Sequence, residues 1–147
     1  MKMIRRSSIS LKANPALTAR RVILDNEKIV YLLVASKPLH YPSGKSRIAY
    51  IGTTKKGGSR IASSVATRES SILNLHGVTE FEARVITCKA RQRVKMWIKL
   101  ERALLLSFRD IFGEVPRCNT HGKGFVEEKE FEYFARNRVN AIIRSLS

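Results

Sequence analysis

The sequence feature that most constrains the fold is the stretch of residues 48–60, which reads Ile-Ala-Tyr-Ile-Gly-Thr-Thr-Lys-Lys-Gly-Gly-Ser-Arg. Its first four residues are apolar and aromatic, as in a β-strand, and Gly52 ends that run. Gly57 and Gly58 allow the backbone to turn sharply, and Ser59 is of a residue type that often caps a helix N-terminus. The stretch therefore predicts the end of a strand, a tight turn, and a helix that starts near Ser59.

Charged and aromatic side chains suggest that this turn belongs to a site. Lys55, Lys56 and Arg60 lie on or just after it, where they would surround a phosphate oxygen. Another strand is predicted earlier in the chain, at residues 29–35, and it carries Tyr31. The strand that begins at residue 48 likewise carries Tyr50. The alternative is that both tyrosines are ordinary strand aromatics, and these two residues alone do not decide between the readings.

The remaining hydrophobic pattern predicts a small α+β fold. The connection at residues 36–47 contains Pro38, Pro42 and Gly44, which favours a long hairpin loop. Residues 80–88 alternate as a third strand should, and residues 93–112 and 127–146 read as helices. We expect a mainly antiparallel three-stranded sheet flanked by helices. The expected organisation is a basic arm at residues 1–28, a domain at residues 29–126 and a C-terminal helix at residues 127–147, packed on the domain or extending it.

The charge of the chain limits its partners. The formal net charge is +16 over 147 residues, and the acids and bases from Glu127 onward cancel, so the excess lies in residues 1–126. Such a surplus favours a polyanionic partner. No apolar run approaches the roughly 18 residues of a spanning helix, so we expect a nucleic acid as the partner and no membrane. Cys88 and Cys118 stand far apart and form no metal or redox motif, and the N-terminus lacks a secretory signal, which favours a cytoplasmic protein.

Glu101 is the most unusual residue of the predicted long helix. At about 100° per residue it falls at the centre of an apolar stripe. A buried carboxylate needs a partner, because desolvating its charge costs several kcal/mol. The partner is either an arginine or lysine in a structural ion pair or a metal ion at the edge of the core. The stripe consists of Val94, Trp97, Ile98, Leu104, Leu105, Phe108 and Phe112.

Taken in order, these residues resemble the GIY-YIG nuclease family over about residues 29–124. Two departures are visible. Ile29 replaces the glycine of the first motif, and Ser64 stands one helical turn after the arginine, where several members carry histidine. The matching residues are Tyr31, Tyr50-Ile51-Gly52, Arg60, Glu101 and Asn119.

The resemblance implies a divalent-metal-dependent hydrolysis of phosphodiester bonds. A tyrosine would act as general base, with Tyr31 as the base and Tyr50 as its orienting partner, or the reverse. Arg60 would hold the scissile phosphate, and Glu101 would hold one Mg²⁺ or Mn²⁺ per active site. Asn119 would position Glu101 or contact backbone phosphate, unless it only caps its loop.

The expected protein is therefore a DNA endonuclease, and a compact, site-specific restriction enzyme is the first hypothesis. One chain offers one site, so we expect a homodimer, at least on DNA. The alternatives are a structure-specific repair or recombination nuclease of the same family and a non-catalytic basic nucleic-acid-binding domain. We read the three histidines as surface residues, with His121 alone close enough to Asn119 to touch DNA. The candidate DNA-contacting residues are Gly52, Lys55, Lys56, Lys89, Arg91, Arg93, Asn119 and Lys123.

Overall fold

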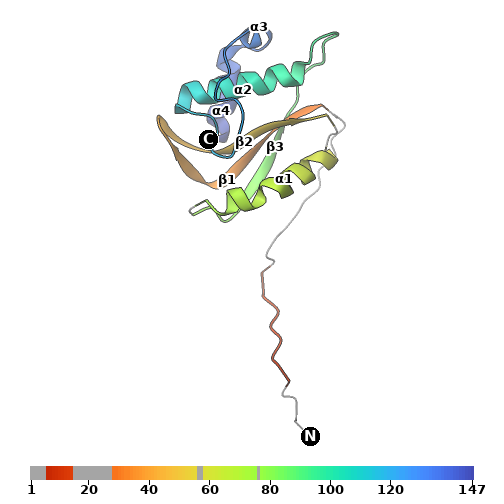
Figure 1. The fold of residues 1–147 in the computed structure, drawn as a ribbon, viewed down its shortest axis with the longest axis vertical. Helices are drawn as coiled ribbons and strands as arrows, with labels where there is room; N and C mark the ends of the chain where they lie inside the picture. The colour runs from red at the N-terminus through yellow and green to blue at the C-terminus, as the bar shows by residue number, and fades with distance from the viewer. Residues whose placement is uncertain (1–5, 15–27, 56–57, 76) are drawn as a thin grey trace.

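The computed structural model describes residues 6–14, 28–55, 58–75 and 77–147, with the side chains of residues 58–60 left aside. Within these residues the chain forms a three-stranded antiparallel sheet and four helices, which confirms the predicted α+β class (Figure 1). Residues 6–14 are exposed throughout and extend away from the rest of the chain in Figure 1. The elements are β1 (Ile29–Tyr41), β2 (Gly44–Thr54), α1 (Gly58–Leu73), β3 (Phe81–Ile86), α2 (Met96–Phe112), α3 (Glu130–Tyr133) and α4 (Arg136–Leu146).

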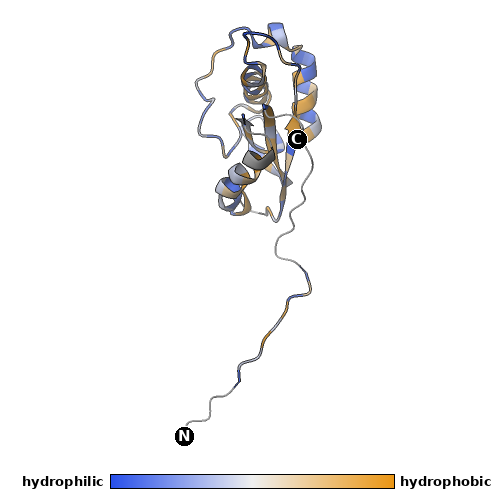
Figure 2. Cartoon of the chain, turned by 90° about the vertical axis from the view of Figure 1, so that its right-hand side faces the viewer, coloured by the Kyte–Doolittle hydropathy of each residue, from blue (hydrophilic) through white to orange (hydrophobic). Residues whose placement is uncertain are grey.

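The central strand is β1, and β2 and β3 flank it on either side. The first seven residues of β1 are all buried, because a strand covered on both faces can be apolar without interruption. The register places Tyr31 opposite Gly52 of β2 and opposite Val85 of β3. The strands run between α1 and α2 (Figure 1), and Figure 2 shows the hydrophobic colour concentrated along them.

The prediction of a long loop at residues 36–47 is wrong. The two strands continue through this segment and meet in a short turn at Pro42 and Ser43, with Tyr41 paired to Gly44. The ladder between β1 and β2 is irregular between Val34 and Leu39, so Pro38 lies where the register shifts. A proline at a bulge removes no ladder hydrogen bond, which explains why it does not end the strand.

The helix α2 begins three residues later than the pattern predicts. Arg91 and Val94 form an isolated bridge, and Arg93 between them has a φ of 64°. Because of this turn, Val94 lies before the helix, although its place in the apolar stripe predicted that it would be part of it. At the other end Gly113 adopts a left-handed φ of 90° and donates its N–H to the Arg109 carbonyl. The helix α1 also differs slightly, since it begins at Gly58 and Ser59 is already inside it.

The C-terminal segment is two short helices and not the single one expected. Phe134 is extended and separates α3 from α4, so Ala135 is exposed instead of lying on an apolar face. The helix α4 packs against α2 and β2 through Val139 and Ile143, both of which are buried.

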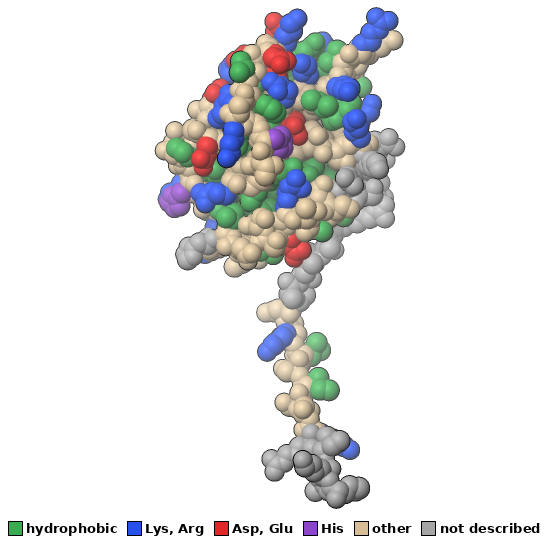
Figure 3. All heavy atoms as spheres, in the orientation of Figure 1, with side chains coloured by type: hydrophobic (Ala, Val, Ile, Leu, Met, Phe, Trp, Pro, Cys, Tyr) green, Lys and Arg blue, Asp and Glu red, His purple; other side chains and the backbone are tan. Residues whose placement is uncertain are grey.

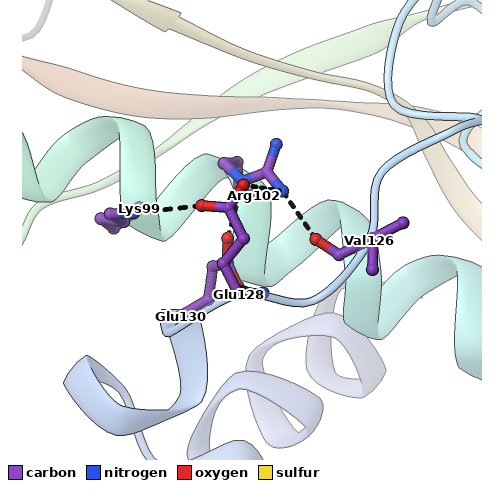
Figure 4. A network of polar contacts seen from close by, with 5 residues as sticks. All are labelled: Lys99, Arg102, Val126, Glu128 and Glu130. Atoms are coloured by element: carbon purple, nitrogen blue, oxygen red, sulfur yellow. Dashed lines mark hydrogen bonds and ion pairs between the residues drawn. The ribbon is translucent and has the colours of Figure 1, made fainter.

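Glu130, the first residue of α3, is held by residues of α2 and of the preceding loop. Its side chain is fully buried and accepts a 2.6 Å hydrogen bond from Nε of Arg102 on α2. Figure 4 shows this network, in which Arg102 also donates to the Val126 carbonyl and Lys99 pairs with Glu128. Burial by itself would raise the pKa of Glu130, but the hydrogen bonds from Arg102 and from backbone amides lower it overall. This carboxylate therefore anchors the segment to α2.

Candidate active site

The two tyrosines meet above Gly52. Gly52 lies opposite Tyr31 across the ladder and two residues after Tyr50, so all three positions share one face of the sheet. The tyrosine rings are 5.9 Å apart between centroids, and their hydroxyls are hydrogen-bonded. A Cβ added at Gly52 would lie 2.5 Å from Cε1 of Tyr50 and 3.0 Å from Oη of Tyr31. Only glycine leaves room for this arrangement.

The surroundings of Tyr50 favour its neutral form. Burial raises the pKa of Tyr50, and both the charge of Tyr31 and the hydrogen bond with Tyr31 raise it further, while Arg68 lowers it. Tyr50 therefore remains a protonated phenol.

Arg68 of α1 lies against this pair. Its guanidinium carbon is 3.9 Å from the centroid of the Tyr50 ring, and Nη1 also donates to the Ser64 carbonyl. Arg68 was not predicted from the sequence as a site residue. It could have been found from its position eight residues after Arg60, which places both arginines on one side of the predicted helix.

Glu101 lies at the same end of the sheet. Its side chain is 13% exposed, accepts a hydrogen bond from the Thr53 hydroxyl, and lies 3.6 Å from Nε2 of His121. Burial raises the pKa of Glu101, while His121, the Thr53 hydroxyl and Arg102 oppose the shift. The side chain in contact with Glu101 is thus a histidine, and not the arginine or lysine that was one of the two expected alternatives beside a metal ion.

His121 is partly exposed, with 38% of its side chain accessible, and it also packs into the site, which the sequence did not predict. Its ring is 6.4 Å from that of Tyr50 and 6.3 Å from that of Phe125. It reaches Glu101 because the loop after α2 runs along the outer edge of β2, where the Cys118 amide donates to the Ala49 carbonyl. Sequence spacing could not indicate this contact, because it depends on the path of an irregular loop.

Asn119 holds that loop in place. Its Oδ1 accepts from the Ile51 amide at 3.0 Å, and its Nδ2 donates to the Ile51 carbonyl at 2.9 Å. The side chain is buried, so the expected contact with DNA does not fit its position. Gly52 is also buried, and it serves the tyrosine pair instead of facing DNA. Asn119 therefore joins the loop to the segment Tyr50-Ile51-Gly52 through the backbone of Ile51.

The predicted basic residues lie around this site. Lys55 is exposed directly after β2, Arg60 lies in the first turn of α1, and Lys56 falls outside the described residues. Lys123 is exposed two residues after His121. Lys89, Arg91 and Arg93 are exposed on the loop between β3 and α2, which projects at the upper right of Figure 1, where Figure 3 shows Lys and Arg side chains gathered.

The residues around Glu101 suit one kind of metal site. Across the described part of the chain, no three His, Cys, Asp or Glu side chains come close enough to form a metal cage. A single carboxylate with mostly water ligands suits Mg²⁺ or Mn²⁺. The raised pKa of Glu101 also indicates a carboxylate that a nearby cation would stabilise.

Comparisons with protein-family models, with curated protein sequences and with solved structures find no match to this chain. None of the helices that the structure describes is long and apolar enough to cross a membrane.

Proposed function

We propose that this protein is a divalent-metal-dependent DNA endonuclease of the GIY-YIG kind. The observation that carries the proposal is the convergence of Tyr31, Tyr50 and Glu101 around Gly52 and Thr53. These residues span 71 positions of sequence and were selected from sequence patterns, and they lie together in the fold. A protein that only binds nucleic acid has no need of a half-buried carboxylate beside a pair of hydrogen-bonded phenols.

The tyrosines supply the proton chemistry. Tyr50 stays protonated because its pKa is raised, so Tyr31 would be the group that takes a proton from the attacking water, with Tyr50 as its hydrogen-bonded partner. A phenol ordinarily titrates near 10, so its phenolate requires positive charge nearby. Arg68 is one such positive charge, because its guanidinium lies over the ring of Tyr50, the neighbour of Tyr31.

Two further groups act on the phosphate. Arg60 would clamp the scissile phosphate, for which a planar guanidinium is well suited. Glu101 would hold one Mg²⁺ or Mn²⁺ by a carboxylate oxygen, with Thr53 and His121 fixing the orientation of the carboxylate. A bound divalent ion stabilises negative charge on the departing oxygen.

One chain carries one Glu101 and therefore cuts one strand. A site-specific restriction enzyme would place two copies across the duplex, and this homodimer on DNA is part of the first proposal. A protein of this kind would act on DNA in the cytoplasm of a bacterium or archaeon, or of a cell infected by a phage. The second candidate is a structure-specific nuclease that acts as a monomer. The net charge of +16 by itself would also fit a basic binding domain without catalysis.

The test compares two glutamate variants that remove the same charge. Supercoiled plasmid and branched DNA are incubated with the wild type, with Glu101→Gln and with Glu132→Gln, in Mg²⁺ or in EDTA. Glu132 is exposed on α3 and serves as the matched control. We expect cleavage by the wild type and by Glu132→Gln in Mg²⁺ only, and none by Glu101→Gln although it still binds DNA. Full cleavage by Glu101→Gln would reject the proposal. Linear product from a dimer would support the restriction enzyme, and nicked product from a monomer would support the second candidate.

A further inference from the structure

Beside the proposed site lies a hollow of about 510 Å³ that none of the residues discussed for catalysis lines. Its walls come from three parts of the chain: Lys28 before β1, the loop after β3, and the first turn of α2. Lys89 and Arg91 belong to the loop, and Met96 and Trp97 to the helix. A volume of this size is in the range that holds a small organic ligand.

The lining combines positive charge with an apolar floor. Lys28, Lys89 and Arg91 are exposed, and within the described part of the chain none of the three forms an ion pair. Val94, Met96 and Trp97 supply apolar surface beneath them. The Lys28 ammonium lies 4.7 Å from the centroid of the Trp97 ring, so the cation is already held over the floor.

The loop that forms the hollow is ordered by its own backbone. Arg91 and Val94 are bridged, and the Met96 amide donates to the Val94 carbonyl at 3.0 Å. Arg93 holds a φ of 64°, which is uncommon for a residue other than glycine. Arg91 also lies over the ring of Tyr133, 5.5 Å from its centroid. The cations therefore project from a defined turn.

We propose that this hollow holds an unpaired nucleotide of the DNA strand that the active site cuts. The proposal rests on the proposed nuclease activity and favours its second candidate, the structure-specific nuclease, because it gives as substrate class DNA with an unpaired nucleotide next to the cut. A duplex backbone needs only a positive surface, whereas the apolar floor is suited to a base or sugar and the rim cations to its phosphate. The chemistry that fits both parts at once is a single nucleotide unit.

The position of the hollow relative to Glu101 predicts the cutting position. Trp97 lies four residues before Glu101, so both are on one side of α2 and about 6 Å apart along the helix axis. We expect the cut to lie close to the unpaired nucleotide.

The binding test uses the single tryptophan of the chain as its reporter. The full-length wild type, in EDTA, is titrated with a four-nucleotide deoxythymidine oligomer, with inorganic phosphate and with a blunt duplex, while Trp97 emission is recorded. The variant is Lys28→Ala with Lys89→Ala. The charge-matched control is Arg138→Ala with Arg144→Ala, two exposed residues of α4. Thermal melting establishes that both double variants are folded.

We expect a saturable emission change with the oligomer, and at least about a tenfold loss of affinity in the lysine variant but not in the control. The salt slope of binding to the single strand should fall by about 0.7 for each lost phosphate contact. An equal loss in both variants, the same emission change with phosphate alone, or equal affinity for the blunt duplex would overturn the proposal. Because the titration needs no metal, the two proposals can fail separately. The oligomer can fail to bind the hollow while Glu101-dependent cleavage is observed, and it can bind while no cleavage occurs.

Discussion

Replacing Arg102 with alanine leaves the carboxylate of Glu130 buried without its cation. The Glu130 side chain is fully buried and that of Arg102 is 18% exposed, with 2.6 Å between Nε and Oε1. Arg102 also lies over the ring of Phe125 and donates to the Val126 carbonyl. Removing one partner of a buried pair typically costs about 3–5 kcal/mol, because the remaining charge is uncompensated. For a chain of this size the melting temperature should fall by about 2–4 °C for each kcal/mol.

A matched arginine shows whether burial is the reason. Arg136 also pairs with a glutamate, Glu127, at 2.8 Å and also lies over an aromatic ring, but its side chain is 45% exposed. Exposed pairs typically contribute less than about 1 kcal/mol. We expect urea unfolding to show a loss of about 3–5 kcal/mol for Arg102→Ala and below about 1 kcal/mol for Arg136→Ala.

The double replacement Arg102→Met with Glu130→Leu completes the comparison. It removes both charges and keeps apolar volume, so it should recover most of the stability that Arg102→Ala loses. If Arg102→Ala costs no more than Arg136→Ala, the pair is solvated and the reasoning is refuted. Should the double variant be as unstable as the single one, packing of the arginine stem would be the main contribution and not the unpaired charge.

Three further predictions concern the site itself. Tyr31→Phe should lower the cleavage rate about 10²- to 10⁴-fold with little change in DNA affinity, and a much larger loss in Tyr50→Phe would reverse the roles of the two phenols. Gly52→Ala should cost about 1–3 kcal/mol in a urea melt and abolish cleavage, because the added Cβ overlaps the Tyr50 ring; full activity would show that the tyrosines do not meet there. Glu101→Gln should be more stable than the wild type at pH 7. The folded-state pKa of Glu101 is raised, so its contribution to stability is fully present below the unfolded-state pKa and is lost as the pH rises through the folded-state pKa. The difference between variant and wild type should therefore shrink as the pH is lowered toward 4, and a difference that grows instead would contradict the raised pKa.

The strands and the tyrosine pair could be predicted because they depend on local patterns. Tyr31 and Tyr50 each lie on an apolar run, and pairing of two adjacent strands brings such runs together. The position of Glu101 followed from helical periodicity, which does not require knowledge of the partner. These inferences involve only neighbours along one element or across one hairpin.

The missed contacts involve distant or irregular segments. His121 reaches Glu101 only because Asn119 fixes the loop on Ile51, 68 residues earlier. The partner of Glu130, Arg102, is 28 residues away on α2, so no local pattern indicates the contact. The hairpin was misread because Pro38 ordinarily ends a strand, and the register shift that accommodates it has no sequence signal.

The pairing of Cys118 and Asn119 with β2 also affects how copies of this protein can associate. Ala49 and Ile51 direct their backbone groups away from β1, and the loop after α2 occupies them. An open sheet edge is a template for strand addition, which can lead to aggregation or to a sheet shared between two molecules. At these residues β2 has no open edge to offer. Two copies that cut opposite strands would therefore not be joined into one sheet through this part of β2, and any contact between them would have to use another surface.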